Sequence, residues 1–345
     1  MNIIEKEIEV KDYLTKSNLP ASDYVINPYV GCPHGCKYCY ASFMKRFTGH
    51  KEEWGTFIDV KRCSKPISKK KLKGKTVFLA SVTDCYNPCK EKYCITQSIL
   101  KQLTDVDCTV SISTKSSLIL RDVELLKQFK DISVAVSVNT LDESFKDDMD
   151  KASSIEVRMK TLKVLHENGI HTVLFMSPIF PAITDYKKII EKSRLFVDEY
   201  WFENLNLRGG YKAWILGYIN EKYPQYTDLY KQIYVEGNKG YWNELAEEIE
   251  AYCASHSVLH TNFFYHEQLV AQKKENIIKS WERFRFGVGE VLAFIGNLRD
   301  TIPRIYTRLE ALLSRMSEIY KMFLYKFCII ILVFRQERMK NLTKM

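Results

Sequence analysis

The stretch NPYVGCPHGCKYCYA, Asn27 to Ala41, places three cysteines in one short segment with the spacing C-x3-C-x2-C. A structural zinc site normally takes four protein ligands, usually as two pairs that lie far apart in the sequence. A [4Fe-4S] cluster takes one ligand for each iron, so three thiolates in one loop leave one iron open to another molecule. The spacing therefore predicts a cluster that is held by Cys32, Cys36 and Cys39.

The alternative for this loop is a zinc site with His34 or Cys63 as the fourth ligand. Gly31 and Gly35 suit either interpretation, because glycine accepts the positive φ angles of a tight turn around a metal group. The first ten residues, MNIIEKEIEV, lack the basic head and the apolar run of an export signal. We therefore expect a cytoplasmic protein whose ten cysteines stay mostly reduced and serve metal binding or catalysis.

Downstream of this loop, short apolar β-prone segments alternate with amphipathic helical ones. The order strand, helix, strand predicts a parallel sheet with right-handed crossovers, either as an open barrel or as a flat doubly wound sheet. In both architectures the site lies at the carboxyl ends of the strands, and the cysteine loop follows the first strand. The six expected strands are residues 23–30, 76–82, 107–114, 132–138, 171–177 and 199–207. The helices expected between them include 94–103, 117–129, 154–170 and 185–196.

The chain divides into three parts by pattern: an N-terminal extension (1–21), an α/β domain with a C-terminal helical cap (22–271), and an appended helical region (272–345). The last part has helical periodicity but no strands, and its role is not apparent. Its apolar run, residues 322–334, is interrupted by Lys326 and is shorter than the roughly 20 residues of a membrane span, so no span is expected.

The cysteine spacing, with Tyr38 before the last cysteine and the context Asn-Pro-Tyr and Tyr-Cys-Tyr, resembles the radical SAM superfamily and its spore photoproduct lyase-like branch. The resemblance covers about residues 22–265 and implies a partial (β/α)6 TIM-like barrel. It also implies a [4Fe-4S] cluster on the three cysteines, with S-adenosylmethionine bound at the open iron. An electron from a flavodoxin- or ferredoxin-type donor would cleave S-adenosylmethionine to a 5'-deoxyadenosyl radical.

The same resemblance suggests which residues contact the cofactors. Tyr38 would lie beside the adenine, unless it is an ordinary core aromatic. Thr83 and Asp84 would hold the methionine amino group, although the superfamily's usual Gly-Gly-Glu is absent and Asp84 would also suit a helix N-cap. The remaining candidates are Ser137 and Asn139 for the ribose or methionine, and Arg158 as a carboxylate clamp or else a solvent-facing helix residue.

A second group of cysteines, Cys85, Cys89 and Cys94, raises two further hypotheses. By resemblance Cys85 is a candidate catalytic hydrogen donor, and the alternative is a buried inert thiol. The three thiols would form an auxiliary cluster only with Cys63 or Cys108 as the fourth ligand. On a helix Cys89 and Cys94 would point about 140° apart, which disfavours it.

We expect the substrate to be a nucleic acid or a nucleotide-like molecule. The basic run Lys65 to Lys75, within a net charge of +9, is suited to phosphates, with a solvated loop as the alternative. An extruded base would stack on aromatic residues: Tyr200, Trp201, Phe202 and Trp214. Two alternatives remain: modification of a partner protein, peptide or small metabolite, and a non-enzymatic zinc-binding module.

Overall fold

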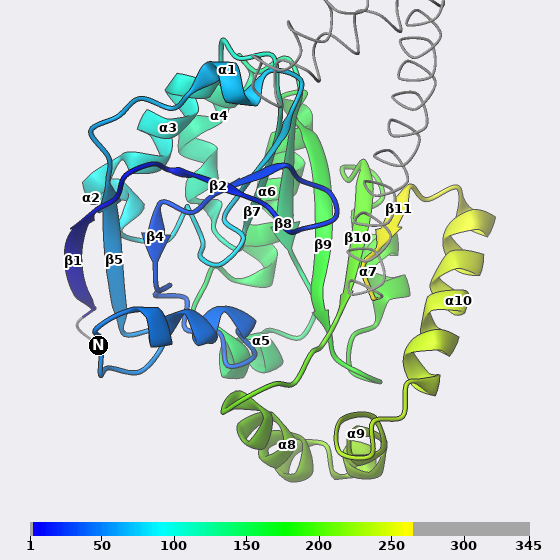
Figure 1. Ribbon diagram of the computed structural model, residues 1–345. Helices are drawn as coiled ribbons and strands as arrows, with labels where there is room; N and C mark the ends of the chain where they lie inside the picture. The colour runs from blue at the N-terminus through cyan, green and yellow to red at the C-terminus, as the bar shows by residue number, and fades with distance from the viewer. Residues whose placement is uncertain (1–2, 265–345) are drawn as a thin grey trace, which may run out of the picture. The chain divides into compact units, whose positions relative to one another are not determined.

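The computed structural model of the chain describes residues 3–264, which are built around an eight-stranded sheet (Figure 1). The strands run in the order β11-β10-β9-β8-β7-β6-β3-β2, and every neighbouring pair is parallel except β2 with β3. The predicted α/β fold, an open partial barrel of parallel strands, is confirmed. Its strands are β2 Leu14–Lys16, β3 Tyr24–Ile26, β6 Thr76–Leu79, β7 Thr109–Thr114, β8 Ile132–Ser137, β9 His171–Ile179, β10 Glu199–Asn204 and β11 His260–Asn262.

Side chains alternate between the two faces of each strand. One face joins a single apolar core with three helices, α3 Ile95–Leu103, α6 Ile155–Glu167 and α7 Tyr186–Ser193. Buried residues of the central strands on this face are Val110, Ile112, Val134, Val136, Leu174 and Met176. The other face, which lines the open barrel, carries polar and aromatic side chains, beginning with Ser111 and Ser133, whose hydroxyls lie 3.1 Å apart.

Local sequence explains where the helices begin and end. Ser154 caps α6 by accepting a hydrogen bond from Val157 N, and Gly169 ends it with φ +75°. The helix predicted over 117–129 is shorter than expected and is split into a 3-10 helix η2, Ser117–Asp122, and α4, Val123–Leu126. The Asp122 carboxylate accepts a hydrogen bond from Gln97 on α3, so a tertiary contact is made at the break.

A smaller three-stranded sheet, which the sequence did not predict, is formed by β1 Ile4–Glu9, β5 Phe57–Arg62 and β4 Tyr29–Val30 in the order β1-β5-β4 (Figure 1, left). The segment 23–30, predicted as one strand, is two. Pro28 has no N–H for a sheet and separates β3 in the large sheet from β4 in the small one. The predicted N-terminal extension thus supplies strands to both sheets.

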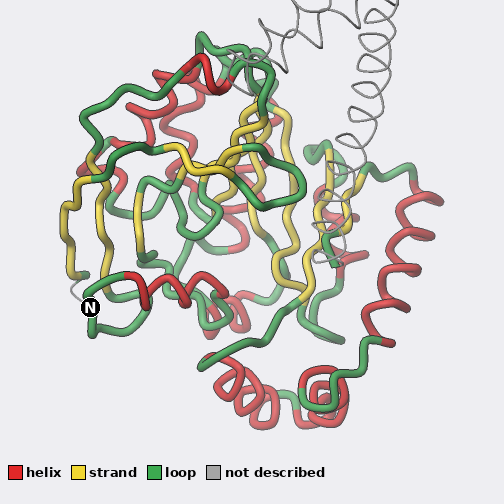
Figure 2. Tube along the Cα trace, in the orientation of Figure 1, coloured by secondary structure: helices red, strands yellow, loops and turns green. Residues whose placement is uncertain are grey.

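The remaining elements connect these layers. They are the 3-10 helix η1 Tyr40–Phe47, α1 Lys69–Leu72, α2 Lys90–Tyr93 and α5 Glu143–Met149, followed after β10 by α8 Tyr211–Lys222, η3 Pro224–Tyr226, α9 Thr227–Tyr234 and α10 Gly240–His256. Figure 2 shows α8, α9 and α10 as a run of helices between β10 and β11. Strand β9 continues through Pro178, two residues beyond the predicted end.

The predicted boundary at 272 and the helical region 272–345 lie outside the described residues. Within residues 3–264, no helix has both the length and the apolar character that crossing a bilayer would require.

Candidate functional site

The cysteine loop follows β4 and packs backbone to backbone against the segment before β5. A Cβ on Gly31, which has φ +89°, would lie 2.4 Å from the carbonyl oxygen of Phe57. A Cβ on Gly55 would lie 2.7 Å from the Cα of Gly35. Both contacts exclude any other residue type at Gly31 and Gly55, since Cβ atoms do not approach backbone this closely. The loop path is therefore specified before any ligand binds.

The three thiols of this loop are free cysteines, Cys32 buried and Cys36 and Cys39 partly so. Burial raises the pKa of all three, that of Cys36 to about 12. They are therefore protonated in the free protein and become thiolates only when a metal displaces the protons. Among the described residues, no group of three Cys, His, Asp or Glu side chains converges closely enough to bind one metal ion. A cluster does not need that convergence, because each thiolate binds its own iron.

Two donors beside the thiols suit an anionic iron–sulfur group. The Trp54 Nε1 atom is buried and has no oxygen or nitrogen acceptor in residues 3–264. Burial raises the pKa of the Cys39 thiol, and the Trp54 N–H opposes that shift. The Lys115 ammonium likewise opposes the upward pKa shift that burial causes at Cys36 and Cys39. An N–H donor beside Cys39 and a cation near Cys36 and Cys39 fit the expected cluster.

Asp84, which follows β6, ties the loop to the large sheet. Its Oδ2 lies 3.1 Å from His34 Nε2 and accepts the Lys115 backbone N–H at 2.7 Å. Its Oδ1 accepts hydrogen bonds from Thr114 Oγ1 and from the Tyr86 backbone N–H, each at 2.8 Å. Burial acts to raise the pKa of Asp84, but His34 and these hydrogen bonds outweigh it and lower the pKa. The carboxylate is thus fully used inside the protein.

Thr83 has a similar role, since its hydroxyl donates to the Gly31 carbonyl at 2.8 Å. Contact between Thr83 or Asp84 and the methionine amino group stays a prediction. Both residues now have an observed function, which is to hold the cysteine loop at the carboxyl end of β6.

Tyr38 and Arg158 meet at a buried carboxylate. The Tyr38 hydroxyl donates to Asp150 Oδ2 at 3.1 Å, and the Arg158 guanidinium binds Asp150 Oδ1. Arg158 also donates to the carbonyls of Ser153 at 2.7 Å and Ser137 at 3.2 Å, and the whole residue is 1% exposed. The solvent-facing alternative for Arg158 is therefore wrong. The carboxylate clamp stays a prediction that would require Arg158 to exchange these partners for the ligand.

The other predicted cofactor residues lie at the carboxyl ends of the neighbouring strands. Ser137 ends β8 and is buried. Asn139 lies two residues later and donates to the Pro178 carbonyl at 3.0 Å. Their contact with ribose or methionine stays a prediction, and the parallel sheet brings both to the edge that carries the cysteine loop.

Cys85 is fully buried next to Asp84, so a role as hydrogen donor stays a prediction. The auxiliary-cluster hypothesis lacks support, because the thiols are directed to different partners. Cys89 Sγ contacts Glu5 and Cys94 Sγ contacts the Glu91 carbonyl.

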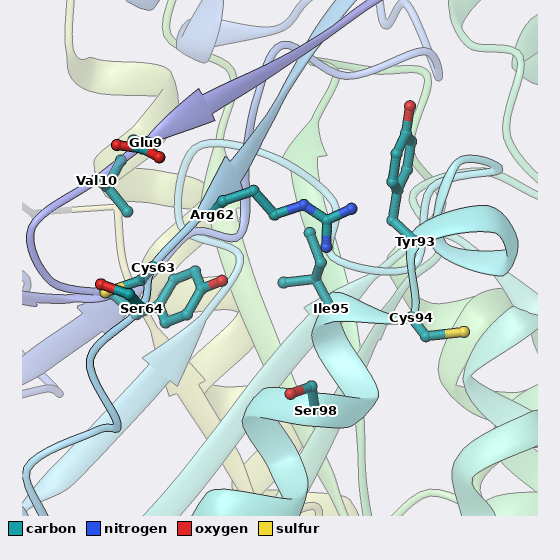
Figure 3. Close-up of a pocket in the computed structure, with 10 residues that line it drawn as sticks. Glu9, Val10, Arg62, Cys63, Ser64, Tyr93, Cys94, Ile95 and Ser98 are labelled. Atoms are coloured by element: carbon teal, nitrogen blue, oxygen red, sulfur yellow. The ribbon is translucent and has the colours of Figure 1, made fainter.

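The zinc alternative also lacks its fourth ligand in the described residues. The His34 imidazole is bonded to Asp84 through Nε2. Phe57, which packs on the cysteine loop, is the first residue of β5, and Cys63 follows the last one. Six strand residues span about 20 Å, so the length of β5 separates Cys63 from Phe57. Cys63 instead lines a separate 520 Å³ pocket with Arg62, Tyr93 and Cys94, in which Cys63 and Cys94 lie on opposite sides (Figure 3).

The wall of the barrel on β9, β10 and β11 is aromatic. Trp201 makes edge-to-face contacts with Phe175 at 5.6 Å and with Phe263 at 5.7 Å. The expectation that Tyr200 and Phe202 stack on a base is wrong, because their side chains alternate to the opposite, buried face of β10. Trp201 faces the barrel and remains a candidate.

The basic run Lys65 to Lys75 does not reach this site. It contains α1 and precedes β6, so it lies at the amino end of the strands, opposite η1 in Figure 1. Three of its lysines pair with carboxylates: Lys69 with Asp105, Lys71 with Asp12 and Lys75 with Asp23. The solvated-loop interpretation is the better one for this segment.

Two residues at the site were missed from the sequence. Lys115 directly follows β7, and its ammonium lies 5.9 Å from the centre of the Tyr38 ring. Tyr40 directly follows Cys39, and its hydroxyl donates to the Ser81 carbonyl. The one signal for Lys115 was its place after a predicted strand, where the site was expected.

Sequence comparisons relate the chain to known proteins. The model of the radical SAM superfamily matches residues 26–191. "Uncharacterized protein MJ0683" of Methanocaldococcus jannaschii is 38% identical over 225 residues, which cover 65% of this chain and 85% of that protein. "Uncharacterized protein Rv2578c" of Mycobacterium tuberculosis is 23% identical over 230 residues, 62% of this chain and 68% of that protein.

Two solved structures are similar to this chain at lower sequence identity. Spore photoproduct lyase complexed with dinucleoside spore photoproduct has a TM-score of 0.45 and 14% identity, with 64% of this chain and 66% of that chain covered. SuiB of Streptococcus suis bound to S-adenosylmethionine has a TM-score of 0.47 and 17% identity, with 69% of this chain and 49% of that chain covered. The matched family region contains Cys32, Cys36 and Cys39, and the chain belongs to the radical SAM superfamily.

Proposed function

We propose that this chain is a radical SAM enzyme that acts on a nucleic acid or a nucleotide-like substrate. Cys32, Cys36 and Cys39 would hold a [4Fe-4S] cluster, and S-adenosylmethionine would bind at its open iron. When bound, and reduced by a flavodoxin- or ferredoxin-type donor, this pair of cofactors supplies a 5'-deoxyadenosyl radical that abstracts a substrate hydrogen. The observation that carries the proposal is a loop with three cysteines and no fourth in the segment Asn27 to Ala41, which Thr83 and Asp84 hold at the carboxyl end of β6.

The residues around the loop divide into two roles. Asp84 and Arg158 are positioning residues, since their charges are satisfied within the protein and fix His34 and Tyr38. Lys115 would attract the carboxylate of S-adenosylmethionine, a role supported by its ammonium 5.9 Å from the Tyr38 ring centre and by its effect on Cys36 and Cys39. Ser137 and Asn139 are the proposed ribose or methionine contacts.

The barrel wall supports a planar substrate. Phe175, Trp201 and Phe263 offer apolar ring surface and exclude water from a reactive intermediate. Glu203, at the carboxyl end of this wall, accepts a hydrogen bond from Ser177 and carries carboxylate oxygens that suit the exocyclic amino group of a base.

A second candidate is modification of a peptide or a small metabolite. Glu199 and Glu203 alternate onto the same face of β10 as Trp201, and two carboxylates there also suit a cationic side chain or amine. A partner protein or peptide would then present that group to the barrel.

Anaerobic reconstitution tests the proposal. The expected product is a brown protein with about four irons and four sulfides per chain, whose electron paramagnetic resonance spectrum changes when S-adenosylmethionine is added. Cys36→Ala should lose the cluster, whereas Cys108→Ala, which removes a thiol outside the loop, should keep it. A colourless zinc protein would refute the radical chemistry. Deuterium transfer into peptides but not into nucleic acid would favour the second candidate.

A further inference from the structure

The exposed aromatic side chains of the described residues gather around the cysteine loop. They are Tyr40, Phe43 and Phe47 of η1 and Trp214 of α8, which are 50%, 43%, 67% and 40% exposed. The other large apolar side chains exposed in residues 3–264 are aliphatic and scattered: Ile4, Val157, Leu195, Val235 and Leu259. Single exposed apolar residues need no explanation, but a concentration of exposed rings marks an interaction site.

A cation lies against these rings on each side of Cys39. The Arg46 guanidinium lies 4.7 Å from the Phe47 ring centre and 5.4 Å from that of Phe43. The Lys37 ammonium lies 5.4 Å from the Trp214 ring centre, which joins the cysteine loop to α8. We define the rim as Lys37, Phe43, Arg46, Phe47 and Trp214.

The cations of the rim differ from those of the basic run in their ion pairing. No ion pair in the part of the chain that the structure describes involves Lys37 or Arg46. Lys69, Lys71 and Lys75 of the basic run, in contrast, are each within ion-pair distance of an aspartate. Three of the six lysines of the basic run are therefore paired, whereas both cations of the rim, beside the cysteine loop, are without an ion pair in the described residues.

We propose that the rim binds a single-stranded nucleic acid that flanks the target nucleotide, an inference that rests on the proposed function. Successive bases stack on exposed rings, and cations beside those rings neutralise the phosphates. The rim borders the carboxyl end of the barrel, so a strand held there can place one extruded base inside. A free nucleotide would not need this surface, and the substrate class is therefore a polynucleotide strand.

The test uses the full-length, reconstituted protein and a fluorescein-labelled 12-nucleotide oligo(dT). Fluorescence anisotropy at several salt concentrations gives the affinity and its salt dependence. Phe47→Ser should weaken binding about tenfold through the lost stacking surface. Arg46→Gln should also weaken binding. It should reduce the slope of log affinity against log salt by about one, which is the contribution of one phosphate contact. Lys70→Gln in the basic run and Leu195→Ser on an exposed helix end should change neither quantity.

Iron content and the spectral response to S-adenosylmethionine are measured on the same samples. Intact values in Phe47→Ser with weakened oligonucleotide binding support the rim. An equal loss of affinity in Lys70→Gln and Arg46→Gln would overturn it, since binding would then follow net charge. Rim variants that bind oligo(dT) normally but reduced flavodoxin poorly would also overturn it and would assign the surface to the electron donor. A wild-type protein that cleaves S-adenosylmethionine without binding oligonucleotide refutes the rim alone, whereas absence of a cluster refutes the proposed function.

Discussion

His34 of the cysteine loop and Asp84 after β6 form a buried pair, with His34 Nε2 3.1 Å from Asp84 Oδ2. The two residues come from different sheets, since β4 precedes the loop and β6 precedes Asp84. This pair is one of the direct side-chain links between the loop that would hold the cluster and the barrel that would hold the substrate, together with Tyr38 and Asp150.

Asp84→Asn should lower the free energy of unfolding by about 2 kcal/mol, because a charged acceptor of several buried hydrogen bonds is lost. The loosened loop should also retain less iron after gel filtration. Anaerobic urea unfolding and iron analysis measure the two effects. Asp105→Asn, at an exposed aspartate paired with Lys69, is the matched control and should change neither. Wild-type stability in Asp84→Asn would contradict the anchoring role.

Arg158→Met should cost about 3 kcal/mol or more in the free energy of unfolding, since it leaves the buried Asp150 carboxylate with only the more distant Lys146 ammonium, 3.8 Å away. The same change should shift the near-ultraviolet circular dichroism of the tyrosines, because Tyr38 shares Asp150. Arg121→Met removes an exposed arginine that pairs with Glu91 and should have little effect. Equal, small losses in both variants would refute the buried anchor.

Trp54→Phe should lower the reduction potential of the reconstituted cluster while leaving its iron content unchanged. A hydrogen bond to a ligand sulfur stabilises the more negative, reduced state, and phenylalanine keeps the ring but removes the N–H. A redox titration followed by electron paramagnetic resonance measures the potential. Trp242→Phe, a buried indole on α10, should leave the potential unchanged. An unchanged potential in Trp54→Phe would show that the indole acts only by packing.

Lys115→Met should weaken S-adenosylmethionine binding about tenfold through the lost ion pair with its carboxylate. Cluster assembly should be normal, since the cysteines are untouched. The spectral change on titration with S-adenosylmethionine measures the affinity. Lys163→Met, at an exposed lysine of α6, serves as the control. If Lys115→Met binds S-adenosylmethionine as tightly as wild type, another residue must contact its carboxylate, and Arg158 is the next candidate.

Asp198 links β9 to β10 and should make stability depend on pH. Its Oδ2 accepts hydrogen bonds from Thr172 N at 2.7 Å and Thr172 Oγ1 at 2.8 Å. Burial acts to raise the pKa of Asp198, but these bonds outweigh it and lower the pKa. A lowered folded-state pKa contributes stability above the ordinary value of about 3.9 and loses it as pH falls through the folded-state value. Asp198→Asn should therefore be less stable than wild type by about 1 kcal/mol at pH 7, and the difference should shrink as pH falls below the ordinary value. A difference that stays constant over the whole acid range would contradict this assignment.

The cysteine loop and the alternation of strands and helices were predictable, because short-range spacing and apolar patterning decide them, although the first expected strand, 23–30, is divided between two sheets. Three thiols within eight residues imply one ligand group whatever the surroundings. The order of alternating strands and helices likewise implies a parallel sheet, and the sheet determines which loop ends share an edge.

The remaining features depend on contacts between distant segments. Strand β1 is charged and exposed, and it forms only because its backbone pairs with β5 more than fifty residues later. Lys115 is one lysine among many until β7 places it beside the cysteines. The sequence by itself determined the three-cysteine loop and the alternation of strands and helices that predicts a parallel sheet. Only the tertiary structure decided that Asp84 and Arg158 are buried anchors and that Lys37 and Arg46 lie against exposed rings, because the partners of these charges come from elsewhere in the chain.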